Sequence, residues 1–329
     1  MNTELQTIAV RYLEAREAVR SVFRMESAYS FPAAANLYVT ADRPVDPEKL
    51  GECKRLIKSE AGIFSNFRGS VLVPLACRLA LCEDPQKRWE RASANYAILK
   101  EHFMRSEFLA LAALLLTDSA QDADVPAFAE RGKALYRRMK SEHPILTGQE
   151  DSVFAILLAE SPKSDDELIA DMEACYRLLD ERFPKGDGIQ AASHVLALTD
   201  GAPAEKAGKV IALYDAIRAA GGKYGKEWEL SALAAFAADG TPVETTVNEM
   251  LEVDALLEGQ NGYSVFGYDR KMRMMHAAML VSACHMRGRD GIVHAAAQQS
   301  AIAMIAAQQA VLCASIACSS AAASAAAVH

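Results

Sequence analysis

The sequence predicts an all-α protein of about six helical hairpins, each of roughly 40 residues, that form an open α-solenoid or a closed α/α toroid. Three observations support this fold class. Apolar residues recur three and four positions apart over most of the chain, as in amphipathic helices. Signals for strands are nearly absent, since no Asn-Gly turn is flanked by alternating strands. Tyrosines recur at positions 96, 136, 176 and 214, at intervals of 40, 40 and 38 residues.

Each tyrosine begins the same apolar stripe in the first helix of a hairpin. Tyr96, Leu99 and Phe103, for example, are three and seven residues apart and therefore share one helix face. A loop and a more apolar second helix follow. The second helices of the four clear copies are expected at 108–118, 151–161, 189–200 and 228–240. Two weaker copies flank them, with 52–64 leading into 68–84 and 252–269 leading into 270–286. Helix 1–24 is expected to cap one end.

The chain divides by composition into a repeat domain at 1–290 and an Ala-rich end at 291–329, which has no Asp, Glu, Lys or Arg. Residues 301–318 approach the length of a membrane span, but central glutamines and the absence of a basic flank argue against one. Ile302, Ile305, Gln309, Leu312 and Ile316 form a helical seam. We expect this segment to form a helix that packs on the repeat domain or on a second copy of the chain.

Charge and cysteine usage exclude several classes of protein. A net charge of −8 without basic runs excludes a nucleic-acid partner. The first 20 residues lack the apolar core of a secretion signal, which indicates a cytoplasmic protein. Seven scattered cysteines without a CxxC pair indicate reduced, buried thiols. We expect neither a metal site nor a cofactor.

The stretch RFPKGDGIQAASHVLALTDG (182–201) holds a GDG that invites comparison with a phosphate loop. A phosphate loop follows a strand and reads GxxxxGK[ST], and neither condition is met. GDG therefore marks the joint between two helices, and Asp187 is expected to cap the second of them. His194, on the apolar run, is interpreted as a core histidine, with a ligand-binding role as the alternative.

The joints before the second helices carry the candidate site residues, because equivalent joints of a repeat array share one surface. Arg68 and Arg105 oppose the helix dipole there, so each is expected either to pair with an acid or to hold an anionic ligand. The other candidate ligand-binding residues are Trp228, Arg270 and His194. A hydrolase would need two carboxylates, which Asp151, Asp187 and Glu227 can supply, although helix capping explains each of them equally well.

The runs HPILT (143–147) and FPKGDGIQAASHVLAL (183–198), with the Ala/Ser-rich end, resemble a bacterial family, the domain of unknown function 4003 (DUF4003) proteins. The resemblance extends over nearly the whole chain and implies a bacterial cytoplasmic protein, but no catalytic residue can be transferred from it. Two functions therefore stay open. The first is a scaffold that binds a protein or peptide. The second is an α/α-toroid enzyme or small-anion binder with its site at the joints.

Overall fold

The computed structural model describes residues 2–63, 65–263 and 267–287. In this part of the chain all regular structure is helical, which confirms the all-α prediction. The helices fall into two compact units. The first unit comprises residues 12–162, and the second comprises residues 163–287 together with residues 2–11.

Helix α1 (Thr3–Val22) contributes residues to both units. The other helices of the first unit are α2 (Ser30–Thr40), α3 (Pro47–Glu60), α4 (Leu72–Ala80), α5 (Pro85–His102), α6 (Glu107–Ser119), α7 (Val125–Glu142) and α8 (Asp151–Ala159). Those of the second unit are α9 (Asp165–Asp180), α10 (Asp187–Ala197), α11 (Pro203–Ala219), α12 (Leu230–Ala234), α13 (Val243–Leu257) and α14 (Arg270–Arg287).

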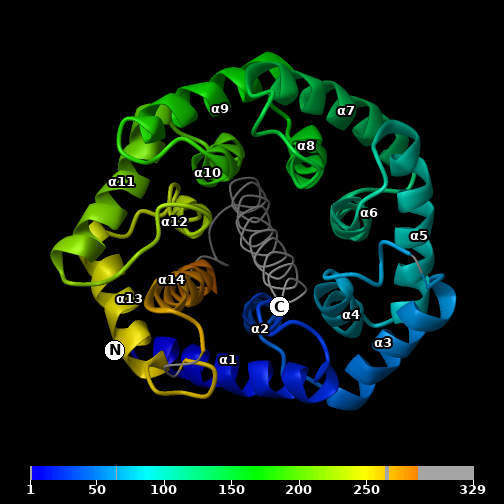
Figure 1. Ribbon diagram of the computed structural model, residues 1–329, viewed down its shortest axis with the longest axis horizontal. Helices are drawn as coiled ribbons and strands as arrows, with labels where there is room; N and C mark the ends of the chain where they lie inside the picture. Colours follow the sequence, from blue (N-terminus) through cyan, green and yellow to red (C-terminus); the bar gives the residue numbers. More distant parts are fainter. Residues whose placement is uncertain (1, 64, 264–266, 288–329) are drawn as a thin grey trace, which may run out of the picture. The chain divides into compact units, whose positions relative to one another are not determined.

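In the first unit, amphipathic helices alternate with buried ones. Helices α3, α5 and α7 each pack against the helix that follows, and α5 also packs against α3 and α7. All residues of α4 and α8 are buried, whereas α3 buries only Leu50, Cys53 and Ile57. Figure 1 shows α4, α6 and α8 nearly end-on, with α3, α5 and α7 lying across the view on one side of them. The core of this unit therefore lies around the buried helices.

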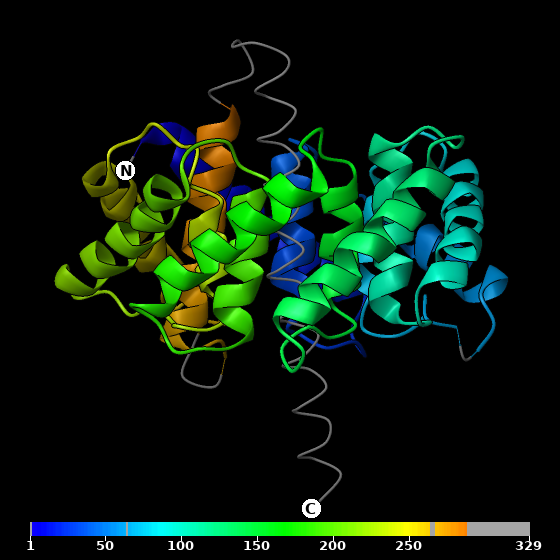
Figure 2. The same cartoon turned by 90° about the horizontal axis from the view of Figure 1, so that it is seen from above.

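The second unit is built in the same way. Helix α9 packs against α10 and α11, α13 packs against α11 and α14, and α12 lies between α10 and α14. In Figure 1, α10, α12 and α14 lie on the same side of α9, α11 and α13, and Figure 2 shows this unit turned by 90°. From Gly188 onward every residue of α10 is buried, including His194, which is 1% exposed.

The last carbonyl groups of the buried helices accept hydrogen bonds from basic side chains. Arg91 Nη1 on α5 donates to the carbonyl of Thr117 in α6 at 3.1 Å, and Arg131 Nη1 on α7 donates to that of Ala159 in α8 at 2.8 Å. In the second unit, Lys163 Nζ, just before α9, donates to the carbonyl of Ala197, the last residue of α10, at 3.0 Å. A cation at a helix C-terminus satisfies unpaired carbonyls and complements the helix dipole. These contacts join α6, α8 and α10 to their amphipathic partners.

The recurring tyrosines lie between neighbouring hairpins. Tyr176 and Tyr214 are buried, and Tyr96 and Tyr136 are half-buried. A phenylalanine that follows the preceding amphipathic helix stacks edge-on against three of them, in the pairs Phe67–Tyr96, Phe103–Tyr136 and Phe183–Tyr214, with ring centroids 5.0, 5.8 and 5.0 Å apart. Edge-to-face contacts of this kind stabilise aromatic pairs. None of the four tyrosines is fully exposed, and three of them have the same kind of aromatic neighbour.

Two elements differ from the sequence prediction. Helix α2 was not predicted, although ten of its eleven residues are buried. Helix α12 covers five residues of the predicted 228–240 segment, because the flanking backbone forms i→i+3 bonds such as Ala232 N–H to Glu229 and Phe236 N–H to Leu233. The predicted Ala-rich helix and the boundary at residue 291 lie outside the described residues. No helix in the described ranges combines the length and apolar character needed to cross a membrane.

Candidate functional site

The two arginines predicted at the joints lie in the first unit. Arg68, just before α4, donates from Nη2 to the carbonyl of Lys58 at 2.9 Å, and Arg105, before α6, is exposed. The expected pairing with acids is not found, because neither guanidinium lies within ion-pair distance of a carboxylate in the described part of the chain. Arg68 is therefore engaged by the backbone, and Arg105 points to solvent.

The N-terminus of α4, beside Arg68, already holds a carboxylate of the protein. Glu107, the first residue of α6, accepts a hydrogen bond from the Ser70 N–H at 2.8 Å. Gly69 permits this approach, since a Cβ there would lie 2.6 Å from Glu107 Oε2. An internal carboxylate thus occupies the position at which a helix N-terminus binds an anion.

The three candidate acids are divided between the units. Asp151, in the first unit, is buried at the start of α8, and its Oδ2 accepts a hydrogen bond from Gly148 N–H at 2.7 Å. Asp187 and Glu227, in the second unit, are both exposed and close enough to interact. Partial burial and the charge of Glu227 raise the pKa of Asp187. The expected capping by Asp187 is wrong, because α10 begins at Asp187 itself and no side chain caps it.

The remaining candidates do not gather into one site. His194 lies in the core of α10, so the structure agrees with a core histidine. Trp228 is half-buried and follows Glu227 directly, whereas Arg270 is exposed at the start of α14, 3.9 Å from Glu258. No hydrogen bond among the described residues holds the carboxylates of Asp187 and Glu227 in place. General acid–base catalysis requires such positioning.

A cluster at the end of α14 escaped the sequence analysis. The imidazole of His285 lies between Asp239, which contacts Nδ1, and Glu249, whose Oε2 is 2.6 Å from Nε2. Burial opposes protonation of the ring, but the two carboxylates outweigh it and raise the pKa of His285. Burial alone would raise the pKa of Asp239. The hydrogen bonds from His285 and from the N–H and hydroxyl of Thr241 instead hold the pKa of this carboxyl well below its usual range. The two carboxylates therefore favour the protonated form of His285.

This cluster makes the stability of the protein depend on pH. Because the pKa of His285 is raised in the folded protein, its ion pairs with the two carboxylates stabilise the fold. This stabilisation is fully present below about pH 6.5 and is lost as the pH rises through the folded-state pKa. We expect His285→Gln to reduce the loss of stability between pH 6 and 9 that wild type shows in urea unfolding. His102→Gln serves as the matched control, because His102 has no described partner. Equal pH profiles for wild type and His285→Gln would contradict the assignment.

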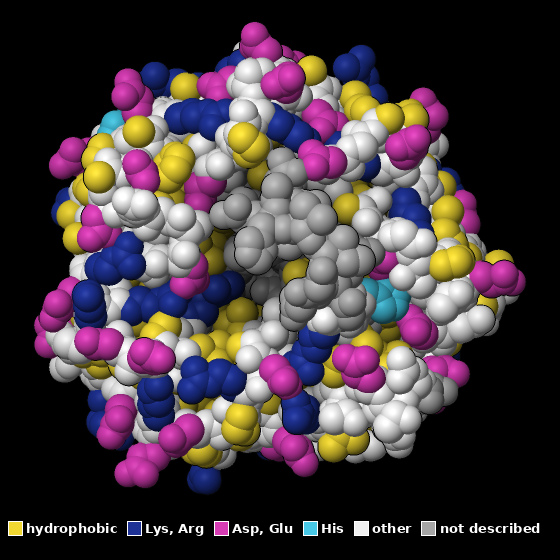
Figure 3. Space-filling view, turned by 180° about the vertical axis from the view of Figure 1, so that it is seen from behind, with side chains coloured by type: hydrophobic (Ala, Val, Ile, Leu, Met, Phe, Trp, Pro, Cys, Tyr) yellow, Lys and Arg dark blue, Asp and Glu magenta, His cyan; other side chains and the backbone are white. Residues whose placement is uncertain are grey.

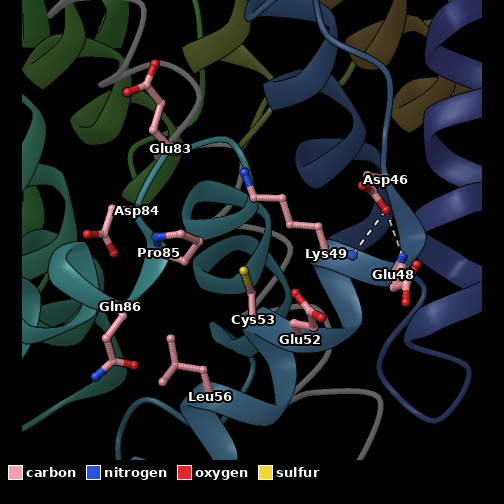
Figure 4. A pocket seen from close by; sticks show the side chains of 10 residues that line it. All are labelled: Asp46, Glu48, Lys49, Glu52, Cys53, Leu56, Glu83, Asp84, Pro85 and Gln86. Carbon is pink, nitrogen blue, oxygen red and sulfur yellow. Dashed lines mark hydrogen bonds between the residues drawn. The ribbon is translucent and has the colours of Figure 1, made fainter.

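A cleft in the first unit lies between the starts of α3 and α5 (Figure 4), with a volume of about 790 Å³. Two of the acidic side chains that line this cleft are helix caps. Asp46 caps α3 by accepting from the N–H groups of Glu48 and Lys49, and Asp84 caps α5 by accepting from Lys87 N–H. Burial raises the pKa of the Cys53 thiol to about 11, so the thiol is not a ready nucleophile. No group of His, Cys, Asp and Glu in the described ranges is arranged to hold a metal ion.

Exposed apolar side chains recur at the joints of the first unit. Met25 follows α1, Ile63 follows α3, Met104 follows α5 and Ile145 follows α7, and their exposed fractions are 94, 80, 74 and 94%. Scattered exposed apolar residues are normal, so these four are distinguished by their recurrence at successive joints rather than by exposure alone. We call these four residues the apolar row. The sequence contained the signal, since they are 38, 41 and 41 residues apart.

The hairpins that carry the apolar row are direct neighbours. Lys54 Nζ on α3 donates to the carbonyl of Val22 at 2.8 Å, which joins the first two of them. Phe67 stacks on Tyr96, and Phe103 on Tyr136, which join the second to the third and the third to the fourth. The four apolar residues therefore belong to successive, contacting hairpins of the unit. On the face that Figure 3 displays, acidic and basic side chains are interspersed rather than separated by sign.

These features define the class of the protein: it is all-helical, with amphipathic helices packed on buried ones and an apolar row at the joints of one unit. The chain belongs to the family described as Protein of unknown function (DUF4003), whose model matches residues 16–310. The family resemblance noted in the sequence is thus confirmed.

The chain is also similar to the uncharacterised protein YeaA of Bacillus subtilis (strain 168), with 29% identity over 169 residues. The match covers 50% of this chain and 51% of YeaA, so the chain spans about half the length of that relative. No solved structure matches the chain.

Proposed function

We propose that this protein is a helical-hairpin repeat scaffold that binds another protein through the apolar row. The row carries the proposal, because four large apolar side chains at equivalent joints are left in water. The equivalent joints of the second unit, about 40 residues further along, present Lys185 and Lys223, which are exposed. The fold of a hairpin therefore does not require an apolar residue at this position. The presence of an exposed apolar residue in four successive joints favours a binding role.

The repeat architecture is itself supported by contacts. Three of the tyrosines, which recur at intervals of about 40 residues, receive an edge-on ring, and basic side chains bind carbonyls in the last turns of α6, α8 and α10. A stack of such hairpins presents an extended surface to which a partner protein can bind. The alternative, an α/α-toroid enzyme or small-anion binder, has less support, because Glu107 and Asp151 fill positions at the starts of α4 and α8 that a ligand would need.

The proposal is tested with a variant in which lysine, the residue found at the equivalent joints of the second unit, replaces three residues of the apolar row. We expect Ile63→Lys, Met104→Lys and Ile145→Lys together to abolish capture of a specific partner from a bacterial lysate, measured by quantitative mass spectrometry against the wild-type chain. Thermal melting should be nearly unchanged, since the three side chains are exposed.

The matched control is Val10→Lys, which changes an exposed apolar residue outside the row. A partner captured equally by wild type, the triple variant and the control would refute binding through the row. Failure of the wild-type chain to enrich any protein reproducibly would refute the scaffold function.

A further inference from the structure

Two arginines of the first unit share a single carboxylate. Arg78, in the last turn of α4, lies with Nη1 3.5 Å from Asp118 Oδ2, and Arg88, in the first turn of α5, donates from Nη2 to Asp118 Oδ1. Helix α5 packs against both α4 and α6, which brings the three residues together. Asp118 carries one negative charge, so the charge of the two guanidinium groups exceeds it by one.

The guanidinium of Arg78 is buried with one edge unused. Arg78 is 9% exposed, and neither Nε nor Nη2 has a hydrogen-bond partner in the described part of the chain. These two atoms form the edge on which an arginine binds a carboxylate or a phosphate through two parallel hydrogen bonds. Burial lowers the pKa of Arg78, an effect that Asp118 offsets and Arg88 reinforces. Unpaired donors on a buried charged group are unfavourable, so this edge lacks a partner.

The neighbouring side chains do not supply that partner. Arg88 directs Nη1 to Cys82 Sγ at 2.8 Å, and its Nε is also buried without a partner in the described ranges. The carboxyl of Glu160, which follows α8, is held at a pKa of about 7 by burial and by the charge of Asp118, so it is partly neutral at pH 7. Outside the described ranges, Asp290 has the one acidic side chain. Apart from Asp290, the anion must therefore come from another molecule.

The unbalanced charge selects between the two ligand groups. A phosphate monoester carries about 1.5–2 negative charges at pH 7, which exceeds the single positive charge left over by Asp118. A carboxylate carries one negative charge, and its two oxygens match the planar edge of Arg78. The side chains of Arg88 and Asp118 are 18 and 32% exposed, so the cluster is open to solvent on that side.

We infer that Arg78, supported by Arg88, binds the carboxylate of a small organic acid in the first unit. Nε and Nη2 of Arg78 donate to the two carboxylate oxygens, Arg88 adds positive charge, and Asp118 orients both guanidinium groups. The site lies near the ends of α4 and α6, whereas the joints that carry the predicted arginines precede these helices. It is independent of the apolar row and adds a small-molecule site to the proposed scaffold.

The test uses the full chain labelled with ¹⁵N and sodium acetate as the probe. Acetate should shift the ¹H–¹⁵N signal of the Arg78 Nε–H, which is identified by its loss in Arg78→Lys. Sodium chloride at the same ionic strength should leave this signal in place, because chloride lacks a second oxygen for the parallel hydrogen bond. Arg78→Lys should weaken acetate binding about tenfold or more, measured from the broadening of the ¹³C-acetate signal, because lysine keeps the charge but has no planar edge.

Arg105→Lys is the matched control, since it alters an exposed arginine of the same unit and should leave acetate binding unchanged. If Arg78→Lys does not fold, Arg88→Gln replaces it; this variant removes the excess charge and should weaken binding severalfold. Equal binding of acetate to wild type and to these site variants would overturn the inference, as would tighter binding of inorganic phosphate than of acetate. A shift of the Arg78 signal in Asp290→Asn without acetate would also overturn it, because the chain itself would then supply the carboxylate.

Discussion

Replacing Tyr214 by alanine is expected to lower the free energy of unfolding by about 3–5 kcal/mol, the range for truncation of a buried aromatic side chain. Tyr214 is 2% exposed, and its ring contacts Phe183 and Tyr224 edge-on at 5.0 and 6.5 Å. The truncation would leave a cavity between α9 and α11 as well as unstack both rings. Chemical denaturation followed by circular dichroism measures the loss.

The comparison for Tyr214 is its counterpart in the first unit. Tyr96 is half-buried, and its hydroxyl accepts a hydrogen bond from Asn66 Nδ2 at 2.6 Å. Tyr96→Ala should therefore cost about 1–3 kcal/mol, since less apolar surface returns to water. If Tyr96→Ala destabilises the protein as much as Tyr214→Ala, burial does not determine the role of the tyrosines.

The second large effect is expected at Gly188, the last glycine of GDG. A Cβ on this residue would lie 2.4–2.6 Å from the carbonyl carbon, carbonyl oxygen and Cα of Glu227. These are backbone atoms, so a rotamer change cannot relieve the overlap, and the α10 and α12 segments must separate. We expect Gly188→Ala to cost about 3 kcal/mol or more, at the upper end for overpacked sites, with a corresponding fall in melting temperature.

Gly208 provides the matched control for this substitution. It lies inside α11, is exposed, and a Cβ there would meet nothing within 4 Å. Gly208→Ala should therefore stabilise the protein by about 0.5–1 kcal/mol through helix propensity alone. A melting temperature of Gly188→Ala equal to that of wild type would show that the two segments are not in close contact.

The joint in GDG shows where sequence reasoning succeeds and where it stops. The absence of a preceding strand was enough to recognise a joint rather than a phosphate loop. The reason for Gly188 was not accessible, because the atoms that exclude a side chain belong to Glu227, almost 40 residues away. Asp187 was interpreted as a cap from residue type alone, whereas the observed N-cap residue is Gly186.

The apolar row and the His285 cluster were missed for related reasons. The three- and four-residue periodicity distinguishes the faces of a helix, but Ile63, Met104 and Ile145 lie in joints, where this helical period does not apply. His285 was missed because the two acids that hold it are 46 and 36 residues away in sequence. Comparing the joints as an aligned set would have revealed the recurring apolar residues, but not that their side chains are exposed.

The sequence by itself determined the all-helical class, the alternation of amphipathic and buried helices, and the recurrence of tyrosines, because these follow from local spacing and from the share of apolar residues in each segment. The tertiary structure decided which joint residues remain in water and which groups the carboxylates bind. Glu107, for example, accepts a hydrogen bond at the N-terminus of α4. Those outcomes depend on the neighbouring hairpin. The physical reason is that burial and ion pairing are properties of contacts between segments, whereas periodicity is a property of one segment.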